Sequence, residues 1–116
     1  MSSAFRFDCV FYYVSDLDRA VRFYSDVLGF PLSSRDVVAR FRVDGVLFEL
    51  VPTADRALLS GNGNARLTLA VEEMGTARAE LAAKGVPTSE VRQVSNGLLA
   101  SCVDPDGNEI VLWQYA

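Results

Sequence analysis

Apolar residues between positions 14 and 32 recur at the spacing of an α-helix. This stripe, which would face a single neighbouring surface, comprises Leu17, Ala20, Val21, Tyr24, Val27 and Leu28. Ser15 offers a hydroxyl cap for the first turn, and Gly29 can adopt the left-handed conformation that ends a helix. The apolar and aromatic run from Phe5 to Val14 comes before the helix and predicts a strand.

Three more strands are predicted after this helix. Leu32–Asp36 and Val38–Val43 are short extended stretches, and the second alternates between apolar and polar residues. Asp44-Gly45 predicts a tight hairpin turn into a fourth strand, Val46–Val51. The polar stretch that follows, from Pro52 to Gly63, predicts a linker.

The second half of the chain repeats this order of elements. A strand is predicted at 67–71, and a helix at 73–84 whose inward residues are Met74, Ala77 and Leu81. Three extended stretches follow, at 86–94, 97–103 and 109–115. The segment Asp-Pro-Asp-Gly-Asn at 104–108 has the composition of a tight turn, so its two aspartates, Asp104 and Asp106, are interpreted as turn formers and not as a catalytic pair.

The two halves are related by a constant offset. Placing Val14 on Val71, 57 residues later, also places Leu17 on Met74. The sequence therefore predicts an α+β fold of two tandem βαβββ modules in a single domain, residues 1–116: module 1 about 1–52, a linker at 53–63 and module 2 about 64–116. A lone module would leave one sheet face uncovered, so we expect the two sheets to form a shared cleft.

Composition narrows the classes of function. Half of the 116 residues are hydrophobic, the formal net charge is −4, and Lys and Arg form no cluster, so nucleic acid is not an expected partner. No apolar run is long enough to span a bilayer and no secretion signal is evident, which predicts a cytoplasmic protein without a membrane partner. Cys9 and Cys102 lie too far apart in sequence for a metal or redox motif.

The chain contains no histidine. It therefore lacks the most common general base and the most common transition-metal ligand. Catalysis by a Ser-His-Asp or Cys-His group, and a His-Glu-x-x-His metal site, are excluded within one chain.

Three motifs resemble those of a known family: VSDLDRAVRFYSDVLGF at 14–30, LFELV at 47–51 and DPDGNEIVLWQ at 104–114. With the duplication, they resemble the vicinal oxygen chelate superfamily of glyoxalase I, extradiol dioxygenases, fosfomycin-resistance enzymes and bleomycin-resistance proteins. The resemblance covers essentially the whole chain. It implies the fold but does not select among the functions of the superfamily.

The resemblance also implies where a metal would be held. The family ligands are usually a His, a carboxylate, a second His and a Glu, and these positions fall on Cys9, Glu49, Arg66 and Val111. Only Glu49 is a good ligand, because a charged guanidinium does not coordinate metals and valine has no donor atom. We therefore expect no metal and no other cofactor.

Strand alternation places the metal positions on one side of the sheets together with aromatic residues. An apolar and aromatic cleft with a few polar groups is the usual composition of a small-molecule site. The candidate ligand-binding residues, none of which is assigned a catalytic role, are Glu49, Arg66, Tyr13, Trp113, Cys9, Phe11 and Val111.

Each candidate also has a purely structural interpretation. Glu49 and Arg66 can pair with each other and hold the modules in register, they can contact a ligand, or they can fail to meet. Tyr13 and Trp113 can fill the core instead of stacking on a ligand, and a core role suits Phe11 better than a role in the site. Cys9 lies in an apolar stretch and is expected to be an inert thiol.

Three functional hypotheses follow from the resemblance. The first is a metal-free small-molecule-binding protein, similar to the bleomycin-resistance proteins, that sequesters an antibiotic or a metabolite. The second is a lyase or isomerase of the glyoxalase I type, with or without a metal, in which Glu49 could act as base. The third is a structural or regulatory module with an empty cleft. The resemblance also implies a homodimer, because the family commonly completes its clefts by pairing chains.

Overall fold

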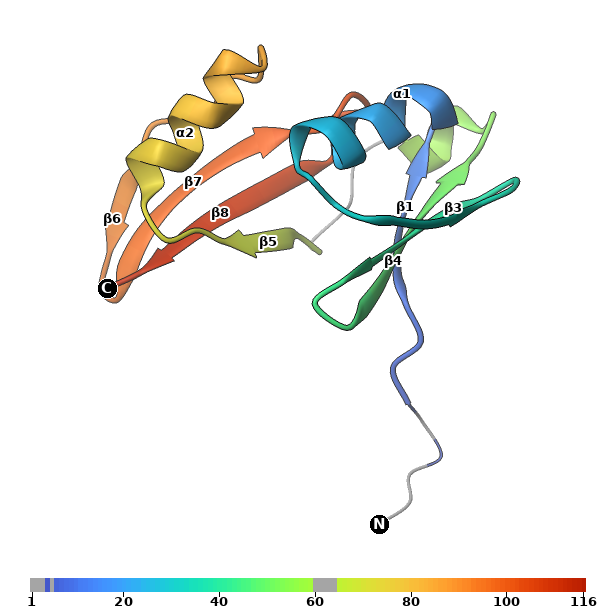
Figure 1. Ribbon diagram of the computed structural model, residues 1–116, viewed down its shortest axis with the longest axis horizontal. Coiled ribbons are helices and arrows are strands. Elements are labelled where there is room, and N and C mark those ends of the chain that lie inside the picture. The colour runs from blue at the N-terminus through green and yellow to red at the C-terminus, as the bar shows by residue number, and fades with distance from the viewer. Residues whose placement is uncertain (1–3, 5, 60–64) are drawn as a thin grey trace. The chain divides into compact units, whose positions relative to one another are not determined.

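The computed structural model describes residue 4, residues 6–59 and residues 65–116. The chain divides into two compact units, Met1–Leu59 and Ser60–Ala116, which we call module 1 and module 2 (Figure 1). Of the predicted linker, residues 60–63 lie outside the described residues. No helix in the described ranges is long and apolar enough to cross a bilayer.

Module 1 is a four-stranded mixed sheet with a helical segment on one face (Figure 1). The strand order is β1-β4-β3-β2, in which β1 and β4 are parallel and the other pairs are antiparallel. The elements in chain order are β1 (Val10–Val14), α1 (Leu17–Arg22), the π-helical turn η1 (Phe23–Val27), β2 (Leu32–Arg35), β3 (Ala39–Val43), β4 (Val46–Pro52) and the 3₁₀ turn η2 (Arg56–Leu59).

Module 2 repeats this topology. Its strand order is β5-β8-β7-β6, in which β5 and β8 are parallel and the other pairs are antiparallel. The elements are β5 (Leu67–Ala70), α2 (Met74–Ala83), β6 (Arg92–Val94), β7 (Gly97–Val103) and β8 (Glu109–Tyr115). The predicted α+β fold of two tandem βαβββ modules is confirmed.

The cap of α1 differs from the prediction. Asp16 is the capping residue, since its carboxylate accepts a hydrogen bond from the backbone N–H of Arg19 at 3.0 Å. Ser15 was predicted for this role. It lies one residue further from the first turn, and its hydroxyl instead accepts a hydrogen bond from the Arg19 guanidinium.

The end of the same helical segment was predicted correctly. Helix α1 continues into η1, where the N–H of Leu28 donates to the carbonyl of Phe23, five residues earlier, at 3.1 Å. Gly29, at φ 76°, then ends the segment in the left-handed conformation.

Aromatic rings form the core of module 1. Tyr24 of η1 is completely buried, and its ring centroid is 5.0 Å from that of Phe48 in β4 and 5.8 Å from that of Phe30. Phe41 of β3 is also fully buried, and its ring centroid is 6.3 Å from that of Phe48. Aromatic pairs at this spacing stabilise a core beyond the effect of their buried area. They fix the helical segment of α1 and η1 to one face of the sheet; the opposite face, which this segment does not cover, we call the helix-free face.

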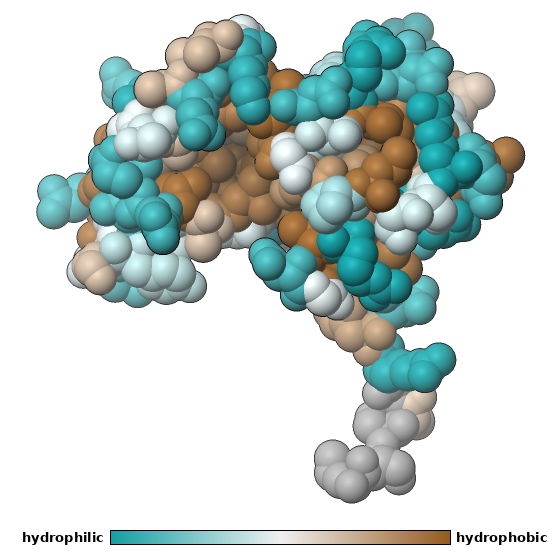
Figure 2. Space-filling model, in the orientation of Figure 1, coloured by the Kyte–Doolittle hydropathy of each residue, from teal (hydrophilic) through white to brown (hydrophobic). Residues whose placement is uncertain are grey.

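The core of module 2 is aliphatic. Met74 and Leu81 of α2 are buried, as predicted, against strand residues that include Ile110 and Leu112. Figure 2 shows hydrophobic residues gathered over β7 and β8, beside α2.

The turn between β7 and β8 contains a buried hydrogen-bonded aspartate. Both carboxylate oxygens of Asp104 accept hydrogen bonds at 2.9 Å, one from the backbone N–H of Asp106 and of Asn108, the other from the Asn108 side chain. This confirms that Asp104 is a turn former.

Two predicted strands are shorter than expected. Phe5 lies outside the described residues, and the rest of the predicted strand to Val14 is a strand only from Val10. Residues 6–9 pair with no strand in the described ranges, and Phe7 is 80% exposed. The stretch 86–94 pairs with β7 only at 92–94. Pro87 interrupts its start, because proline cannot donate a ladder hydrogen bond.

Candidate functional site

The helix-free face of the module 1 sheet carries the residues that alternation predicted. Tyr12 and Val14 of β1 are buried toward the helical segment, whereas Phe11 and Tyr13 project to the other face. Their rings meet edge-on, with centroids 5.1 Å apart. Phe11 is 44% exposed, so within module 1 it lies outside the core, whereas the sequence favours a core position for it.

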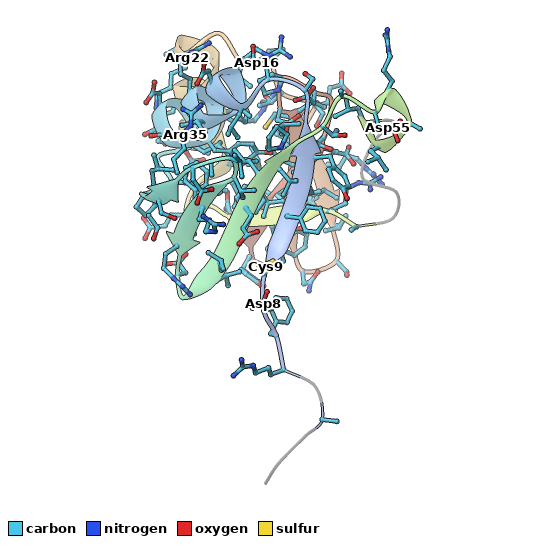
Figure 3. All side chains as sticks on the ribbon, turned by 90° about the vertical axis from the view of Figure 1, so that its right-hand side faces the viewer. Asp8, Cys9, Asp16, Arg22, Arg35 and Asp55 are labelled. Atoms are coloured by element: carbon cyan, nitrogen blue, oxygen red, sulfur yellow. The ribbon has the colours of Figure 1, made fainter. Side chains whose placement is uncertain are left out.

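Cys9 lies directly before β1, beside Asp8 (Figure 3). It is half-buried. Burial raises the pKa of its thiol, and the nearby carboxylates of Glu49 and Asp8 raise the pKa further. A thiol that stays protonated is a poor nucleophile and a poor metal ligand, which supports the interpretation of Cys9 as inert.

Glu49 of β4 has an ion-pair partner in its own sheet. Arg40 lies directly opposite in β3, and its Nε is 3.5 Å from Oε2 of Glu49. The Glu49 side chain is 19% exposed and that of Arg40 is 34% exposed. Arg40 also donates to Asp36 at 3.3 Å and to Ser34 at 3.5 Å. The charge of Glu49 is therefore balanced within module 1.

The sequence contains a signal that would have placed Arg40. A two-residue turn at 44–45 pairs Val43 with Val46, and the same register then sets Arg40 opposite Glu49. A contact between Glu49 and Arg66, one of the possibilities that the sequence leaves open, would join the two modules. It stays a prediction.

Arg66 likewise has a partner in its own module. It directly precedes β5, and its Nε donates to Oε1 of Glu109, the first residue of β8. Its Nη1 also donates to the carbonyl of Ala65 at 2.9 Å. The Arg66 and Glu109 side chains are 38% and 40% exposed. The sequence alone does not mark Glu109 as this partner, because the contact depends on the strand pairing of β5 with β8.

A hollow of about 510 Å³ lies on the module 2 sheet. Its strand residues include Leu99, Ser101, Glu109 and Val111. The rest of its lining comes from segment 89–92, which we call the rim: Ser89, Glu90 and Arg92. Of the predicted site residues, Val111 lines this hollow. No sequence motif marks the rim, because it is an irregular extended segment.

Trp113 of β8 pairs with Ala70 of β5 and is half-buried. Its ring meets that of Tyr115 edge-on, with centroids 5.6 Å apart. Gly97 of β7 lies against the indole, since a Cβ at position 97 would come within 3.0 Å of the ring. Whether Tyr13 and Trp113 share one cleft stays a prediction, because the two residues belong to different modules.

The strand registers relate the four family metal positions in pairs. Phe11 pairs with Glu49 in module 1, and Thr68, 57 residues after Phe11, pairs with Val111 in module 2. Glu49 and Val111 therefore occupy corresponding places. Cys9 and Arg66 also correspond, since each directly precedes the first strand of its module.

These positions do not fit a catalytic metal. Module 2 contributes no donor atom, because Arg66 is cationic and bonded to Glu109 and Val111 is an alkyl side chain. Module 1 contributes one carboxylate, paired with Arg40, and one thiol with a raised pKa. No group of three His, Cys, Asp or Glu side chains in the described ranges is placed to hold a metal. Catalytic sites need three or four ligands.

The Glyoxalase/Bleomycin resistance protein/Dioxygenase superfamily model matches residues 6–112. The chain belongs to this superfamily. No curated protein matches the chain.

Solved structures with this fold have diverse functions. TnmS3, an antibiotic binding protein from Streptomyces sp. CB03234, is 25% identical over 99% of this chain and 100% of its own, with a TM-score of 0.76. The fosfomycin resistance protein FosX from Listeria monocytogenes, complexed with Mn(II) and sulfate, is 14% identical over 96% and 90%, with a TM-score of 0.79. A lactoylglutathione lyase from Agrobacterium tumefaciens is 17% identical over 94% and 92%, with a TM-score of 0.75. The last two similarities concern the fold alone.

Proposed function

We propose that this protein binds a small molecule without a metal ion and sequesters it, as a cytoplasmic homodimer. The observation that carries the proposal is the side-chain set at the family metal positions. In module 2, Arg66 is bonded to Glu109 and Val111 has no donor atom, so half of the family ligand set is lost.

Two further observations support binding. The hollow on module 2 has a volume within the usual range of small-molecule sites, and it combines apolar floor residues with a few polar groups. The antibiotic binding protein TnmS3 is similar over the full length of both chains. An antibiotic or a metabolite is therefore the proposed class of ligand.

The alternative is a lyase or isomerase of the glyoxalase I type in which Glu49 acts as base. Arg40 Nε lies 3.5 Å from Oε2 of Glu49, so a proton taken from a substrate would have to reach a carboxylate that an arginine already contacts. The binding function is accordingly better supported.

The test is a thermal-shift screen in the presence of EDTA. The panel contains bleomycin and a mixture of small antibiotics and metabolites, and mass spectrometry identifies what stays bound after desalting. We expect at least one molecule to raise Tm, because a ligand that binds only the folded state stabilises it. A panel that never raises Tm, or does so only when metal is added, contradicts the proposal.

A matched pair of variants locates the binding site. Val111→Gln places an amide on the floor of the hollow and should reduce the ligand-dependent rise in Tm. Val103→Gln is the control, since Val103 is 52% exposed and does not line the hollow. Light scattering tests the homodimer, and a monomeric mass at working concentration counts against it.

A further inference from the structure

The hollow on module 2 carries two charges that are not used inside the fold. Arg66 and Glu109 neutralise each other at one side of it. Arg92 and Glu90, both exposed, line the rim, and neither has an ion-pair partner among the residues that the structure describes. The hollow therefore presents one guanidinium and one carboxylate to whatever enters it.

The rim is held in place by hydrogen bonds to β7. The N–H of Ser89 donates to the carbonyl of Ser101 at 2.8 Å, and the N–H of Ser101 donates to Oγ of Ser89 at 2.9 Å. At the other end of the rim, Arg92 begins β6 and pairs with Leu99. Glu90 lies between these two attachments.

Helix α2 fixes the rim from its other side. The Arg78 guanidinium donates through Nε to Oγ1 of Thr88 and through Nη2 to the carbonyl of Ser89, both at 3.0 Å. A backbone tied on both sides loses less conformational entropy when a ligand binds, so the backbone that carries the two rim charges is preorganised.

We propose that this hollow binds a zwitterionic ligand with an apolar body, whose carboxylate pairs with Arg92 and whose ammonium group pairs with Glu90. The inference rests on the proposed function and names its ligand class. Arginine matches a carboxylate through two parallel N–H donors. A purely anionic ligand would meet the Glu90 carboxylate at the same rim, and a purely cationic ligand would meet Arg92. The body packs on Leu99 and Val111.

Three probes with one indole body test the charge requirement: L-tryptophan, indole-3-propionate and tryptamine. Their dissociation constants are measured by ¹⁵N NMR titration of the intact protein. We expect tryptophan to bind about fivefold more tightly than either singly charged probe, because it forms one more ion pair and a solvated ion pair changes a dissociation constant by about this factor. Arg92→Gln should weaken tryptophan and indole-3-propionate by about fivefold and leave tryptamine unweakened. Glu90→Gln should weaken tryptophan and tryptamine instead.

Two exposed residues outside the hollow supply matched controls. Arg56→Gln in η2 and Glu80→Gln in α2 change the net charge by the same amount, and both should leave all three dissociation constants unchanged. These controls separate rim recognition from the overall charge of the protein.

The outcomes separate this inference from the proposed function. Equal binding of the three probes, or binding that neither rim variant alters, overturns the zwitterion assignment and leaves small-molecule binding intact. If none of the three probes binds and the thermal screen finds a ligand that lacks one of the two charges, the zwitterion assignment is likewise overturned and small-molecule binding stands. Failure of every probe and of the whole screen overturns both.

Discussion

Arg40 and Glu49 face each other across β3 and β4, with Arg40 Nε 3.5 Å from Glu49 Oε2. Glu49 is the one good ligand left at the family metal positions, and here its charge is balanced by an arginine from the neighbouring strand. Module 2 has an analogous pair, Arg66 with Glu109. In each module, the charged residue at a family metal position therefore has a partner of opposite charge in the same module.

The Arg40–Glu49 pair should appear as a coupling energy. Arg40→Met and Glu49→Gln should each lower the free energy of unfolding. The double variant should lose less free energy of unfolding than the two single variants lose together. We expect a coupling of about 1 kcal/mol, because both side chains are partly exposed. Urea denaturation of the four proteins measures it.

Two comparisons calibrate this cycle. Arg42→Met removes an exposed arginine of β3 that lies opposite Leu47, so it should show no coupling to Glu49→Gln. A cycle of Glu49→Gln with Arg66→Met tests the predicted contact between the modules. A larger coupling to Arg66 than to Arg40 would contradict the pairing described here.

Cys9 should react slowly with thiol reagents at neutral pH. Its raised pKa, caused first by burial and then by Glu49 and Asp8, means that the thiolate forms only at higher pH than in an ordinary cysteine. Glu49→Gln removes one negative charge and should lower this pKa, so that alkylation at pH 8 becomes faster. Iodoacetamide labelling over a pH series, with Cys9 and Cys102 resolved by peptide mass, provides the rate. An unchanged labelling profile would show that Glu49 does not act on the thiol.

Restoring donor atoms at the family positions should create metal binding. The triple variant Cys9→His, Arg66→His, Val111→Glu supplies three ligands in addition to Glu49. We expect it to retain about one Zn²⁺ or Mn²⁺ after desalting, because the superfamily resemblance implies metal ligation from these four positions and each would then carry an N or O donor. The double variant that keeps Arg66 is the control and should retain less metal, because it offers only three donors and places a guanidinium at the fourth position. Equal metal retention by the control would show that Arg66 does not block the site.

Glu73 should stabilise α2 in a pH-dependent way. It caps the helix, and hydrogen bonds from the Thr76 hydroxyl and then from the N–H groups of Thr76 and Gly75 lower its pKa. A carboxyl with a lowered pKa contributes fully above its ordinary pKa, and the contribution is lost as pH falls through the lowered value. Glu73→Gln should therefore lower Tm at pH 7, and the difference should shrink toward about pH 3. Glu72→Gln, at the exposed neighbouring position, is the control, and an equal effect there would contradict the cap.

Local patterns in the sequence were sufficient for the fold. The apolar stripe and Gly29 define the helical segment of module 1, and the offset between Val14 and Val71 defines the duplication. The first signal depends on residues that are close in sequence, and the second depends on a repeat. The π-helical turn η1 was not predicted, because no local motif marks it; its Tyr24 packs among rings of β3 and β4.

The candidate site was less predictable. Strand alternation placed Glu49 and Arg66 on the helix-free side of their sheets, but their partners Arg40 and Glu109 come from the pairing of strands. The rim charges were missed for a related reason: Arg92 enters the hollow through the register of β6 on β7. Such contacts join residues that no local motif connects.

Native mass spectrometry of the ligand complex tests metal-free binding most directly. The protein is incubated with the molecule that raises Tm most, together with equimolar Zn²⁺ and Mn²⁺, and the mass of the complex is read without further treatment. The account predicts a complex whose mass equals protein plus ligand, with no metal. A complex that forms only with about one metal ion per chain, and that loses both metal and ligand in Glu49→Gln, would contradict it.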